Sequence, residues 1–410
     1  MPAPRRVAVT GLGAISALGG DLATTWQGIV EGRCGIARHD GDAWPLARVT
    51  GFDPAAHFNA RELPMLDRVT QFTLVAAREA LNAGRHGANL PSLAAAGIDP
   101  TRCGAVYAAG LGHHTLDDAY QAFYGRKANR LHPFVVPRGM PSAPASQLSI
   151  VHGLQGPTVA TASACASSAH ALALAAHLIR SGLLDIALSG GAEASLVPGM
   201  VKGWEGLRVL SADGCRPFSA DRSGLVLGEG AAVLVLEDWD HAERRGARPL
   251  AEVLGFGMGA DAADITRPSA SGAERVMRAA LVDAEIAPAA LDYVNAHGTG
   301  TRLNDASESQ ALRAIHGDTL ARLPVSSSKG QIGHALNAAG ALEAAITILA
   351  LRNGVLPPTA GHRASDPDCV PDCVPNSGRL QPIEIAMSNS FAFGGLNAAL
   401  IFKRTSSRRP

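Results

Sequence analysis

The chain has 410 residues, 47% of them hydrophobic and 4% aromatic, and its 36 basic and 36 acidic side chains cancel when the histidines are neutral. This length predicts a globular protein with an ample core in two closely packed, domain-sized units. Zero net charge gives no support to a nucleic acid or a membrane surface as a partner. The many glycines (45) favour helices packed closely on sheets, with numerous tight turns.

The cysteines do not form the paired framework of a small secreted domain. They are Cys34, Cys103, Cys165, Cys215, Cys369 and Cys373. Because a strand-like run begins soon after the N-terminus, we expect no leader peptide and a reducing, cytoplasmic location. The most apolar stretch, residues 338–351, is interrupted by Glu343, so we expect no membrane span.

Apolar runs and helical periodicities alternate along the chain. We expect strands at residues 7–13, 104–109, 156–162, 185–191, 231–237, 251–257 and 293–296. We expect helices at residues 21–31, 67–83, 116–124, 165–180 and 273–284, and one that ends near residue 351. The segment "GLGAIS" at 11–16 looks superficially like a dinucleotide-binding fingerprint. It lacks the third glycine and no helix begins directly after it, so we interpret it as a strand that runs into a glycine turn.

One order of elements occurs twice. Residues 67–112 and 273–300 both contain a helix, a proline-containing turn, a strand and a glycine-rich loop. Residues 161–184 and 326–351 both contain a strand end, a turn of small residues, a histidine and an Ala/Leu-rich helix. We therefore predict an internal duplication of β–α units around a shared core, with the two halves docked directly on one another. The predicted halves are residues 1–249 and 250–410.

Small residues surround Cys165 in the segment "TASACASSAH". A strand–turn–helix unit would place Cys165 at the start of a helix, where backbone N–H groups and the helix dipole favour a thiolate. Small neighbours would let a substrate carbonyl approach the sulfur and the adjacent amides. A lone cysteine is more often part of the core, so this interpretation depends on the second half of the chain.

In the second half, two histidines lie where strands are expected to end. "NAHGTGT" contains His297, and "SSSKGQIGH", which contains Lys329 and His334, occupies the place that Cys165 has in the first copy. Active sites of α/β folds gather at such strand ends, so we group these residues into one candidate site. The neighbouring pair His113 and His114 lacks a third metal ligand at a suitable spacing, and we expect it in a loop near an interface or pocket.

These segments resemble one family. Cys165, His297, Lys329 and His334 in their motifs, together with "NSFAFGGLN" at 389–397, are similar to the β-ketoacyl-[acyl-carrier-protein] synthases of the elongating type. That type includes synthases I and II and the type II polyketide and nodulation-type ketosynthases. The resemblance covers nearly the whole chain and implies the thiolase fold, an α/β architecture with a duplicated five-layer αβαβα sandwich.

Three residues depart from the usual family pattern. Leu396 replaces a threonine in the "GFGGTN" motif, Asp264 stands where many members have a histidine, and Ser328 replaces a common threonine. The segment "KGWEGLRVLSADGCRPFSADRSGLVLGEGA" is especially similar to specialised ketosynthases. The effect of the first two departures on the site stays open at this point.

The resemblance implies an acyltransferase that condenses an enzyme-bound acyl group with malonyl-acyl-carrier-protein and releases CO2. The product would be a 3-oxoacyl-acyl-carrier-protein, in fatty acid or type II polyketide-like biosynthesis. Cys165 would hold the acyl group, and the N–H groups of Cys165 and Phe393 would form the oxyanion hole. His297 and His334 would donate hydrogen bonds to the enolate that forms when CO2 is lost.

The resemblance also assigns supporting residues. Lys329 and Glu343 would form a pair that orders the site, with Glu343 nine residues beyond His334 on the same helix. Thr299 and Thr301 would contact the pantetheine arm of the carrier, and Leu111 would limit the depth of the acyl pocket. The residues of the gate for the second substrate would be Phe391, Phe393 and Gly394.

The expected partners are an acyl carrier protein and a second, homologous subunit. The subunit would be another copy or a chain-length subunit, and would contact residues around 110–150. Candidate residues for docking the acidic carrier are Arg126, Lys127, Arg130, Lys202 and Arg208. No redox or nucleotide cofactor is expected. Residues at which a structural monovalent cation could bind are Asn304, Glu308, Glu343, Ser388 and Asn389.

Other functions fit the sequence less well. A non-catalytic chain-length subunit would lack the nucleophile that Cys165 provides. Chalcone-type enzymes and starter-unit synthases would have asparagine at His334, and a thiolase would have a second catalytic cysteine near residues 389–397. A cysteine hydrolase, from a different class, would need one cysteine, one histidine and an orienting acid, and would leave the second histidine and Lys329 unexplained.

Overall fold

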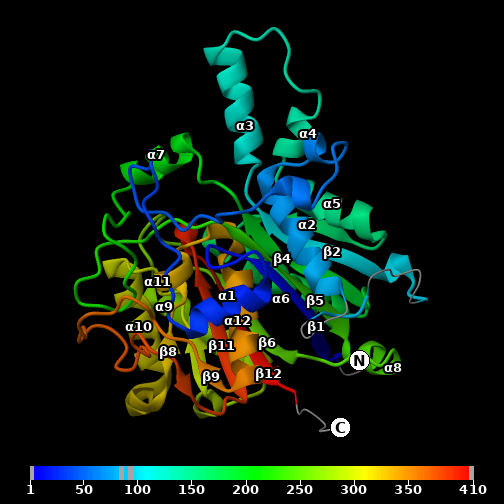
Figure 1. Cartoon of the computed structure of the whole chain (residues 1–410). Helices are drawn as coiled ribbons and strands as arrows, with labels where there is room; N and C mark the ends of the chain where they lie inside the picture. The colour runs from blue at the N-terminus through cyan, green and yellow to red at the C-terminus, as the bar shows by residue number, and fades with distance from the viewer. Residues whose placement is uncertain (1–3, 83–86, 91–96, 406–410) are drawn as a thin grey trace.

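The computed structural model describes residues 4–82, 87–90 and 97–405 (Figure 1). The strands are β1 (Val7–Ile15), β2 (Cys103–Ala109), β3 (Thr158–Thr161), β4 (Ile186–Glu193), β5 (Gly230–Asp238), β6 (Ala251–Ala260), β7 (Tyr293–Asn295), β8 (Val325–Ser326), β9 (Val355–Leu356), β10 (Arg379–Leu380), β11 (Ile385–Phe391) and β12 (Leu396–Arg404). The α-helices are α1 (Leu22–Val30), α2 (Arg68–Leu81), α3 (His113–Tyr120), α4 (Val135–Gly139), α5 (Ala143–His152), α6 (Ser167–Arg180), α7 (Pro198–Gly206), α8 (Trp239–Arg244), α9 (Ala270–Asp283), α10 (Arg302–His316), α11 (Lys329–Ile332) and α12 (Ala339–Asn353).

The main sheet consists of two half-sheets with the same topology. The strand order is β3-β2-β4-β5-β1 in the first half and β8-β7-β11-β12-β6 in the second. In each half the three strands at the outer end are parallel and the other pairings are antiparallel. Only Ala8 with Glu252 and Val9 with Ala251 pair across the junction of β1 and β6. This repeated order confirms the predicted duplication.

Helices form three layers around the half-sheets. The buried helices α6 and α12 lie between them, α2 and α5 cover the outer side of the first half, and α9 and α10 cover the second (Figure 1). Helix α12 is buried on every face from Ala339 to Leu351, as expected for a helix whose Ala, Leu and Ile residues leave no broad polar side. The architecture is therefore the predicted αβαβα sandwich.

The glycines near the N-terminus lie inside a strand, contrary to the sequence interpretation. β1 continues through Gly11 and Gly13 to Ile15 without a turn. A Cβ atom on Gly11 would lie 2.2 Å from the carbonyl oxygen of Ala80, and one on Gly13 would lie 2.1 Å from that of Ala76. Glycine at these positions allows α2 to approach the sheet closely. This packing accounts for both glycines, so neither a turn nor a nucleotide-binding loop is needed to explain them.

Two expected helices have different bounds. Helix α2 is capped by the Asp67 side chain and ends at Leu81, and the expected end at residue 83 lies outside the described residues. The helix expected at residues 116–124 begins earlier, so His113 and His114 form its first turn rather than a loop. After Tyr120 the chain continues in one π-helical turn, and this segment rises above the body of the molecule (Figure 1).

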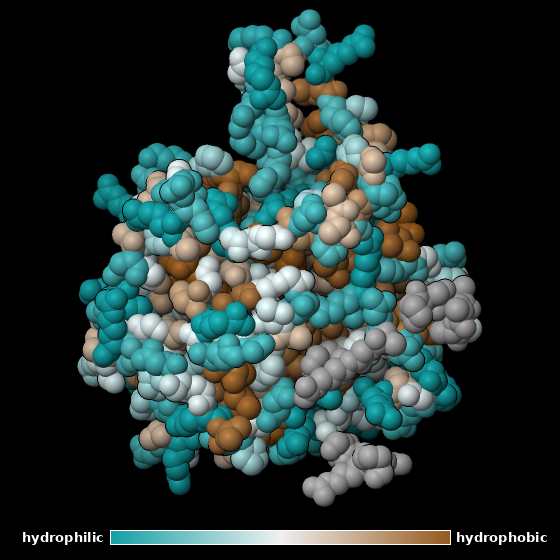
Figure 2. Space-filling model, in the orientation of Figure 1, coloured by the Kyte–Doolittle hydropathy of each residue, from teal (hydrophilic) through white to brown (hydrophobic). Residues whose placement is uncertain are grey.

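The face shown in Figure 2 is mostly hydrophilic, with apolar side chains gathered near α4 and α5 at the base of this raised segment. Ile150 and Val151 on α5 are 72% and 46% exposed. Among the residues that the structure describes, no helix is both long and apolar enough to cross a membrane. The cytoplasmic location stays a prediction.

Candidate active site

Cys165 lies in a sharp turn between β3 and α6. The turn is a single 3₁₀ unit, Ala164–Ala166, and Ala164 has a positive φ of 49°, which few non-glycine residues adopt. Ser167 holds the turn, because its hydroxyl accepts from the N–H of Ser163 (2.8 Å) and donates to the carbonyl of Ala164 (2.6 Å). The Cys165 side chain is thereby fixed at the entry to α6.

Burial dominates the chemistry of the Cys165 thiol. It raises the pKa of Cys165 to about 11, although the charge of Lys329 and the N–H groups of Phe393 and Cys165 lower it. The expected thiolate is therefore not favoured in the resting protein: Cys165 is buried in an apolar cluster that also contains Leu196 and Leu336, and this burial outweighs the effect expected of the helix dipole. The two N–H groups that face the sulfur lie where an oxyanion on a bound acyl group would need donors.

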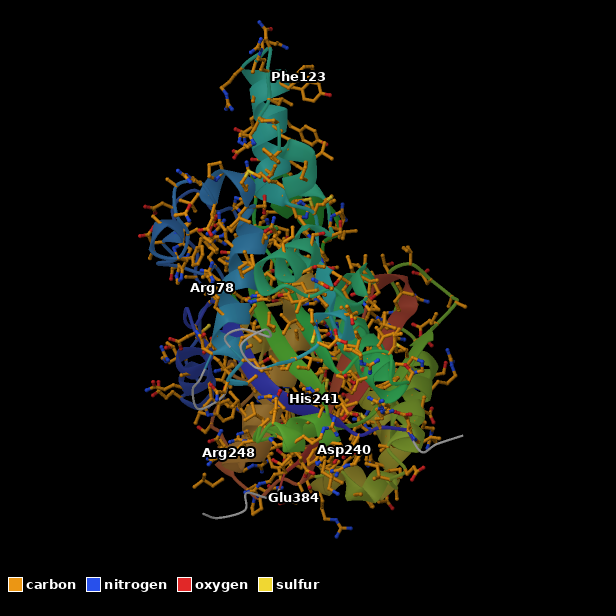
Figure 3. All side chains as sticks on the ribbon, turned by 90° about the vertical axis from the view of Figure 1, so that its right-hand side faces the viewer. Arg78, Phe123, Asp240, His241, Arg248 and Glu384 are labelled. Atoms are coloured by element: carbon orange, nitrogen blue, oxygen red, sulfur yellow. The ribbon has the colours of Figure 1, made fainter. Side chains whose placement is uncertain are left out.

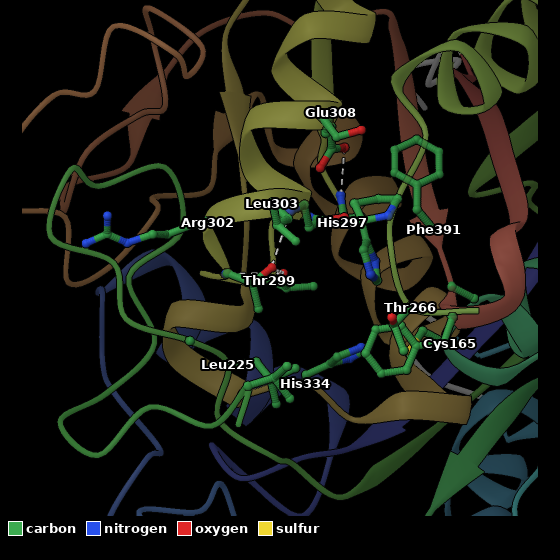
Figure 4. Close-up of a pocket in the computed structure, with 18 of the residues that line it drawn as sticks. Cys165, Leu225, Thr266, His297, Thr299, Arg302, Leu303, Glu308, His334 and Phe391 are labelled. Atoms are coloured by element: carbon green, nitrogen blue, oxygen red, sulfur yellow. Dashed lines mark hydrogen bonds between the residues drawn. The ribbon is translucent and has the colours of Figure 1, made fainter. Parts of the chain in front are cut away.

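His297 follows β7 and His334 follows α11, and both point toward Cys165 (Figure 4). The two imidazole rings meet edge to face, with centroids 5.2 Å apart and an angle of 82° between their planes. Both side chains are almost fully buried, at 2% and 1% exposed. The structure therefore brings together the three residues that the motifs singled out.

Both histidines are neutral. Burial, followed by the nearby charge of Lys329, holds the pKa of His297 and of His334 well below the usual value. The Lys329 ammonium donates to the carbonyl of His297 (2.6 Å) and lies 3.4 Å from its Nδ1. Because an ammonium has no acceptor, Nδ1 of His297 accepts and Nε2 carries the proton. The ring nitrogens of His334 have no partner among the described residues.

Lys329 and Glu343 form a buried ion pair, as the resemblance implied. Burial raises the pKa of Glu343 to about 7, although the Lys329 charge lowers it. The expectation that Glu343 shares a helix with His334 is wrong: α12 begins at Ala339, and His334 lies in the segment between α11 and α12. Glu343 reaches the site from the second turn of α12. The ion pair of Lys329 and Glu343 therefore connects the site to the buried helix between the half-sheets.

The loop after β11 carries Phe393, whose N–H is the second expected oxyanion donor. Phe391 ends the strand, and Phe393 begins a turn in which Gly394 and Gly395 have φ values of 80° and 68°. A Cβ atom on Gly395 would lie 2.5 Å from that of Asp261, so both its conformation and its contact require glycine.

The three departures from the family pattern lie in different surroundings. Leu396 is the first residue of β12 and pairs with Ala260. Asp264 is exposed, and its carboxylate accepts from the N–H groups of Thr266 and Arg267 (2.8 and 2.9 Å), which fixes a turn whose Thr266 lines the cavity beside Cys165. Ser328 is buried beside Lys329 and its hydroxyl has no partner among the described residues.

Two acidic residues of α10 hold the loop that contains His297, a role that the sequence analysis missed. Glu308 accepts from the N–H groups of His297 and Gly298, both at 2.9 Å (Figure 4). Asp305 accepts from those of Thr299 (3.0 Å) and Gly300. Two acids three residues apart at the start of a helix share one face, and this spacing could have revealed them.

One cavity of about 310 Å³ opens onto Cys165, His297 and His334. Its wall also contains Thr299, Thr301, Asn304, Glu308, Phe391, Phe393, Arg208 and Trp204. Leu111 does not line it: this side chain lies just beyond β2 and is 44% exposed. The cavity thus brings the expected nucleophile, both neutral imidazoles and an expected oxyanion donor into one space. Such a set suits acyl transfer followed by stabilisation of an enolate.

Known proteins are similar to this chain over nearly its whole length. Two family models match: Beta-ketoacyl synthase, N-terminal domain, over residues 4–242, and Beta-ketoacyl synthase, C-terminal domain, over residues 250–363. The chain belongs to the β-ketoacyl synthase family. Nodulation protein E of Rhizobium leguminosarum bv. trifolii is 42% identical over 415 residues, which cover 98% of this chain and 99% of that protein.

Two further family members are similar in sequence and structure. The 3-oxoacyl-[acyl-carrier-protein] synthase 2 of Staphylococcus aureus (strain COL) is 36% identical over 414 residues, 98% of each chain. A solved structure of the ishigamide ketosynthase/chain length factor has a TM-score of 0.90 and 33% identity, and covers 98% of this chain and all of that one. The thiolase fold and the acyltransferase class of this β-ketoacyl synthase are thereby confirmed.

The candidate docking residues of this synthase lie in two different parts of the structure. Arg208 lines the cavity, and Lys202 on α7 forms an exposed ion pair with Glu205 (2.7 Å). The others, Arg126, Lys127 and Arg130, lie on the raised segment after α3 and do not line the cavity.

The candidate cation residues fit in part. Buried oxygens of Glu343 and Asn389 have no partner among the described residues, and oxygen ligands suit an alkali cation. Glu308 instead accepts from the Asn389 amide (3.1 Å), and the Asn304 amide donates to Asp305 (3.2 Å). Within the described chain no group of three or more His, Cys, Asp or Glu side chains could hold a metal ion.

Proposed function

We propose that this synthase condenses an acyl group held on Cys165 with malonyl-acyl-carrier-protein, with loss of CO2, to give a 3-oxoacyl-acyl-carrier-protein. The observation that supports it best is one cavity in which a buried cysteine faces two neutral histidines. The similarity to 3-oxoacyl-[acyl-carrier-protein] synthase 2 supports the same reaction. The setting is fatty acid or type II polyketide-like biosynthesis.

In the first half-reaction, Cys165 takes the acyl group from its carrier. The sulfur forms a bond to the thioester carbonyl carbon, the carrier's C–S bond breaks, and the thiol proton of Cys165 passes to the departing carrier thiol. Because burial keeps the Cys165 pKa near 11, a neutral imidazole in the cavity is the group available to carry that proton. The N–H groups of Cys165 and Phe393 hold the transient oxyanion.

In the second half-reaction, malonyl loses CO2 and its thioester becomes an enolate. Nε2–H of His297 and an N–H of His334 donate hydrogen bonds to the enolate oxygen. The enolate carbon then bonds to the acyl carbonyl carbon, the bond from that carbon to the sulfur breaks, and Cys165 leaves as a thiolate that takes up one proton from solvent. Neutral donors suit this step because a carboxylate in their place would repel the enolate.

The hydrolase alternative fits the geometry poorly. A cysteine hydrolase needs an acid that accepts from the histidine ring. Here Nδ1 of His297 faces the Lys329 ammonium, and Glu308 binds the backbone N–H of His297. The chain-length-subunit alternative also fits poorly, because Cys165 and both histidines are present.

We test the proposal with Cys165→Ala and a panel of acyl-carrier-protein thioesters, measured by intact mass. Acyl mass should add to the wild type and to Cys34→Ala, a control at an exposed thiol outside the cavity, but not to Cys165→Ala. Cys165→Ala should lose condensation and keep malonyl decarboxylation, because both histidines remain. Acylated Cys165→Ala, or wild type that no donor acylates even with a partner subunit, would contradict the proposal.

We also propose that the synthase assembles with another copy or with a homologous chain-length subunit, through residues around 110–150. Support comes from large exposed apolar side chains on this segment (Figure 3 labels Phe123 at its tip). Phe123, Tyr124 and Val136 are 52%, 66% and 76% exposed. An acyl carrier protein is the proposed transient partner, and a cation near Glu343 and Asn389 stays a prediction.

A further inference from the structure

His170 on helix α6 contacts both sides of the turn that contains Cys165. Its Nδ1 lies 2.7 Å from the hydroxyl oxygen of Ser163, two residues before Cys165. The ring also forms a hydrogen bond with the carbonyl of Ala166, the residue directly after Cys165. Because these two contacts bracket Cys165, the ring contributes to the direction in which the Cys165 N–H, the first expected oxyanion donor, points.

The same ring reaches the other half of the molecule. It forms a hydrogen bond with the carbonyl of Asn397, in the first turn of the chain into β12, and α6 packs on β12. Asn397 pairs with Phe391 at the end of β11, so these two residues close the loop that contains Phe393. The two expected donors, the N–H groups of Cys165 and Phe393, therefore come from different halves of the chain. Their separation depends on contacts between the halves, and His170 provides one.

Asn397 is also held from its other side. Its side-chain amide donates to Asp261 (2.8 Å), and the Asp261 N–H donates to the carbonyl of Gly395 within the same loop (2.9 Å). Asn397 is 3% exposed. The base of the loop is therefore one unit with β6 and β12, and His170 ties this unit to the Cys165 turn.

The His170 ring makes this tie in its neutral form. Burial lowers its pKa, although the hydrogen bonds with the carbonyls of Ala166 and Asn397 raise it. A neutral imidazole has one N–H and one acceptor nitrogen, and the Ser163 hydroxyl can either donate or accept, so it complements the ring in either tautomer. A phenyl ring of similar size would fill the same space without any of these contacts.

We propose that His170 is a positioning residue that sets the separation of the two oxyanion donors. By joining the turn before α6 to the start of β12, the ring keeps the N–H groups of Cys165 and Phe393 directed at one point, the carbonyl oxygen of the acyl group. It acts on the steps in which that oxygen becomes negative, namely acylation of Cys165 and attack by the enolate. Malonyl decarboxylation, in which His297 and His334 hold the enolate oxygen, does not depend on it. This inference rests on the proposed condensing function.

The first test compares His170→Phe with His177→Phe, a control at an exposed histidine two turns later on the same helix. We measure acylation of Cys165 by the best donor of the thioester panel, and alkylation of Cys165 by iodoacetamide, which needs the thiol but no oxyanion donor. His170→Phe should slow acylation at saturation about 100-fold, because losing one oxyanion donor has an effect of this size. The donor concentration at half-saturation and the alkylation rate should match those of the wild type and of His177→Phe. Acylation at the wild-type rate, or an equal loss of acylation and alkylation, overturns the inference.

The second test does not depend on His170→Phe being folded. Ser163→Ala removes one partner of the ring and should slow acylation about tenfold, the size of one hydrogen bond. Malonyl decarboxylation is measured in Cys165→Ala with and without Ser163→Ala, and should be equal in both. Unchanged acylation in Ser163→Ala, or decarboxylation that falls as much as acylation, contradicts the positioning role. Failure of the proposed function would instead appear as wild type that no donor acylates.

Discussion

Lys329 sets the charge state of the candidate site although it touches the cavity only through other residues. Its ammonium pairs with Glu343, fixes the tautomer of His297 and lowers the pKa of both histidines. Burying one charge without an opposite charge beside it is costly. Lys329 and Glu343 are therefore tolerated in the core only when both are present. Sequence reasoning found both residues through the family resemblance, because nothing in their spacing shows that they meet.

Replacing Lys329 alone should destabilise the protein strongly. Lys329→Met leaves the Glu343 carboxyl buried without its partner, which costs about 3–5 kcal/mol of unfolding free energy. The double variant Lys329→Met, Glu343→Leu should regain much of that stability in urea unfolding, but neither variant should condense, because His297 loses its donor at Nδ1. Recovery of activity in the double variant would show that the tautomer argument is wrong.

The neutral histidines predict how stability depends on pH. The unfolded chain takes up protons at His297 and His334 near pH 6.5, whereas the folded chain keeps both neutral to well below that pH. The unfolded state therefore binds more protons, and the free energy of unfolding should fall as the pH drops below about 6.5, by up to about 1.4 kcal/mol per pH unit for each histidine. Urea unfolding at several pH values between 7.5 and 5 measures this slope. His297→Asn, His334→Asn should flatten it, and an equally steep slope in that variant would assign the effect to other groups.

At the scale of elements, sequence periodicity predicted the buried helices best. The Ala/Leu pattern placed the helix after Cys165 within two residues of α6, because such residues favour helix in any packing. It failed at Gly11 and Gly13, where the close approach of α2 decides the conformation and leaves no trace in local sequence. It also missed the contact of His170 with Asn397, because a hydrogen bond between α6 and the start of β12 depends on tertiary structure.

The raised segment around α3 and α4 predicts an interface. Val136→Glu places a charge at a side chain that is 76% exposed in the single chain and that we expect to be covered in the assembly. The variant should convert the assembly to single chains in light scattering after size exclusion, because burying an unpartnered carboxylate is unfavourable. Leu380→Glu, at an 88% exposed position on β10, is the control and should leave the mass unchanged. If the Val136→Glu assembly has the same mass as the wild-type assembly, the interface does not include Val136.

At the scale of the whole molecule, the two halves share their central layer. Helix α6 belongs to the first half but also contacts β6 and β12, and α12 belongs to the second half but also contacts β4 and β5. The predicted division at residues 249 and 250 falls just before β6, where β1 and β6 also pair. The sequence repeat predicted two units, but it could not predict that helices of each half also pack on the sheet of the other.

This shared layer predicts a single folding unit despite the duplication. Residues 1–249 alone would expose the face of α6 that packs on α12, and residues 250–410 alone would expose the face of α12 that packs on α6, β4 and β5. Each fragment should therefore aggregate or stay unfolded, while the two expressed together should recover soluble protein. The intact chain should unfold in one transition that far-ultraviolet circular dichroism and tryptophan fluorescence report at the same urea concentration. Two separate transitions, or a fragment that folds cooperatively alone, would mean that each half has a sufficient core of its own.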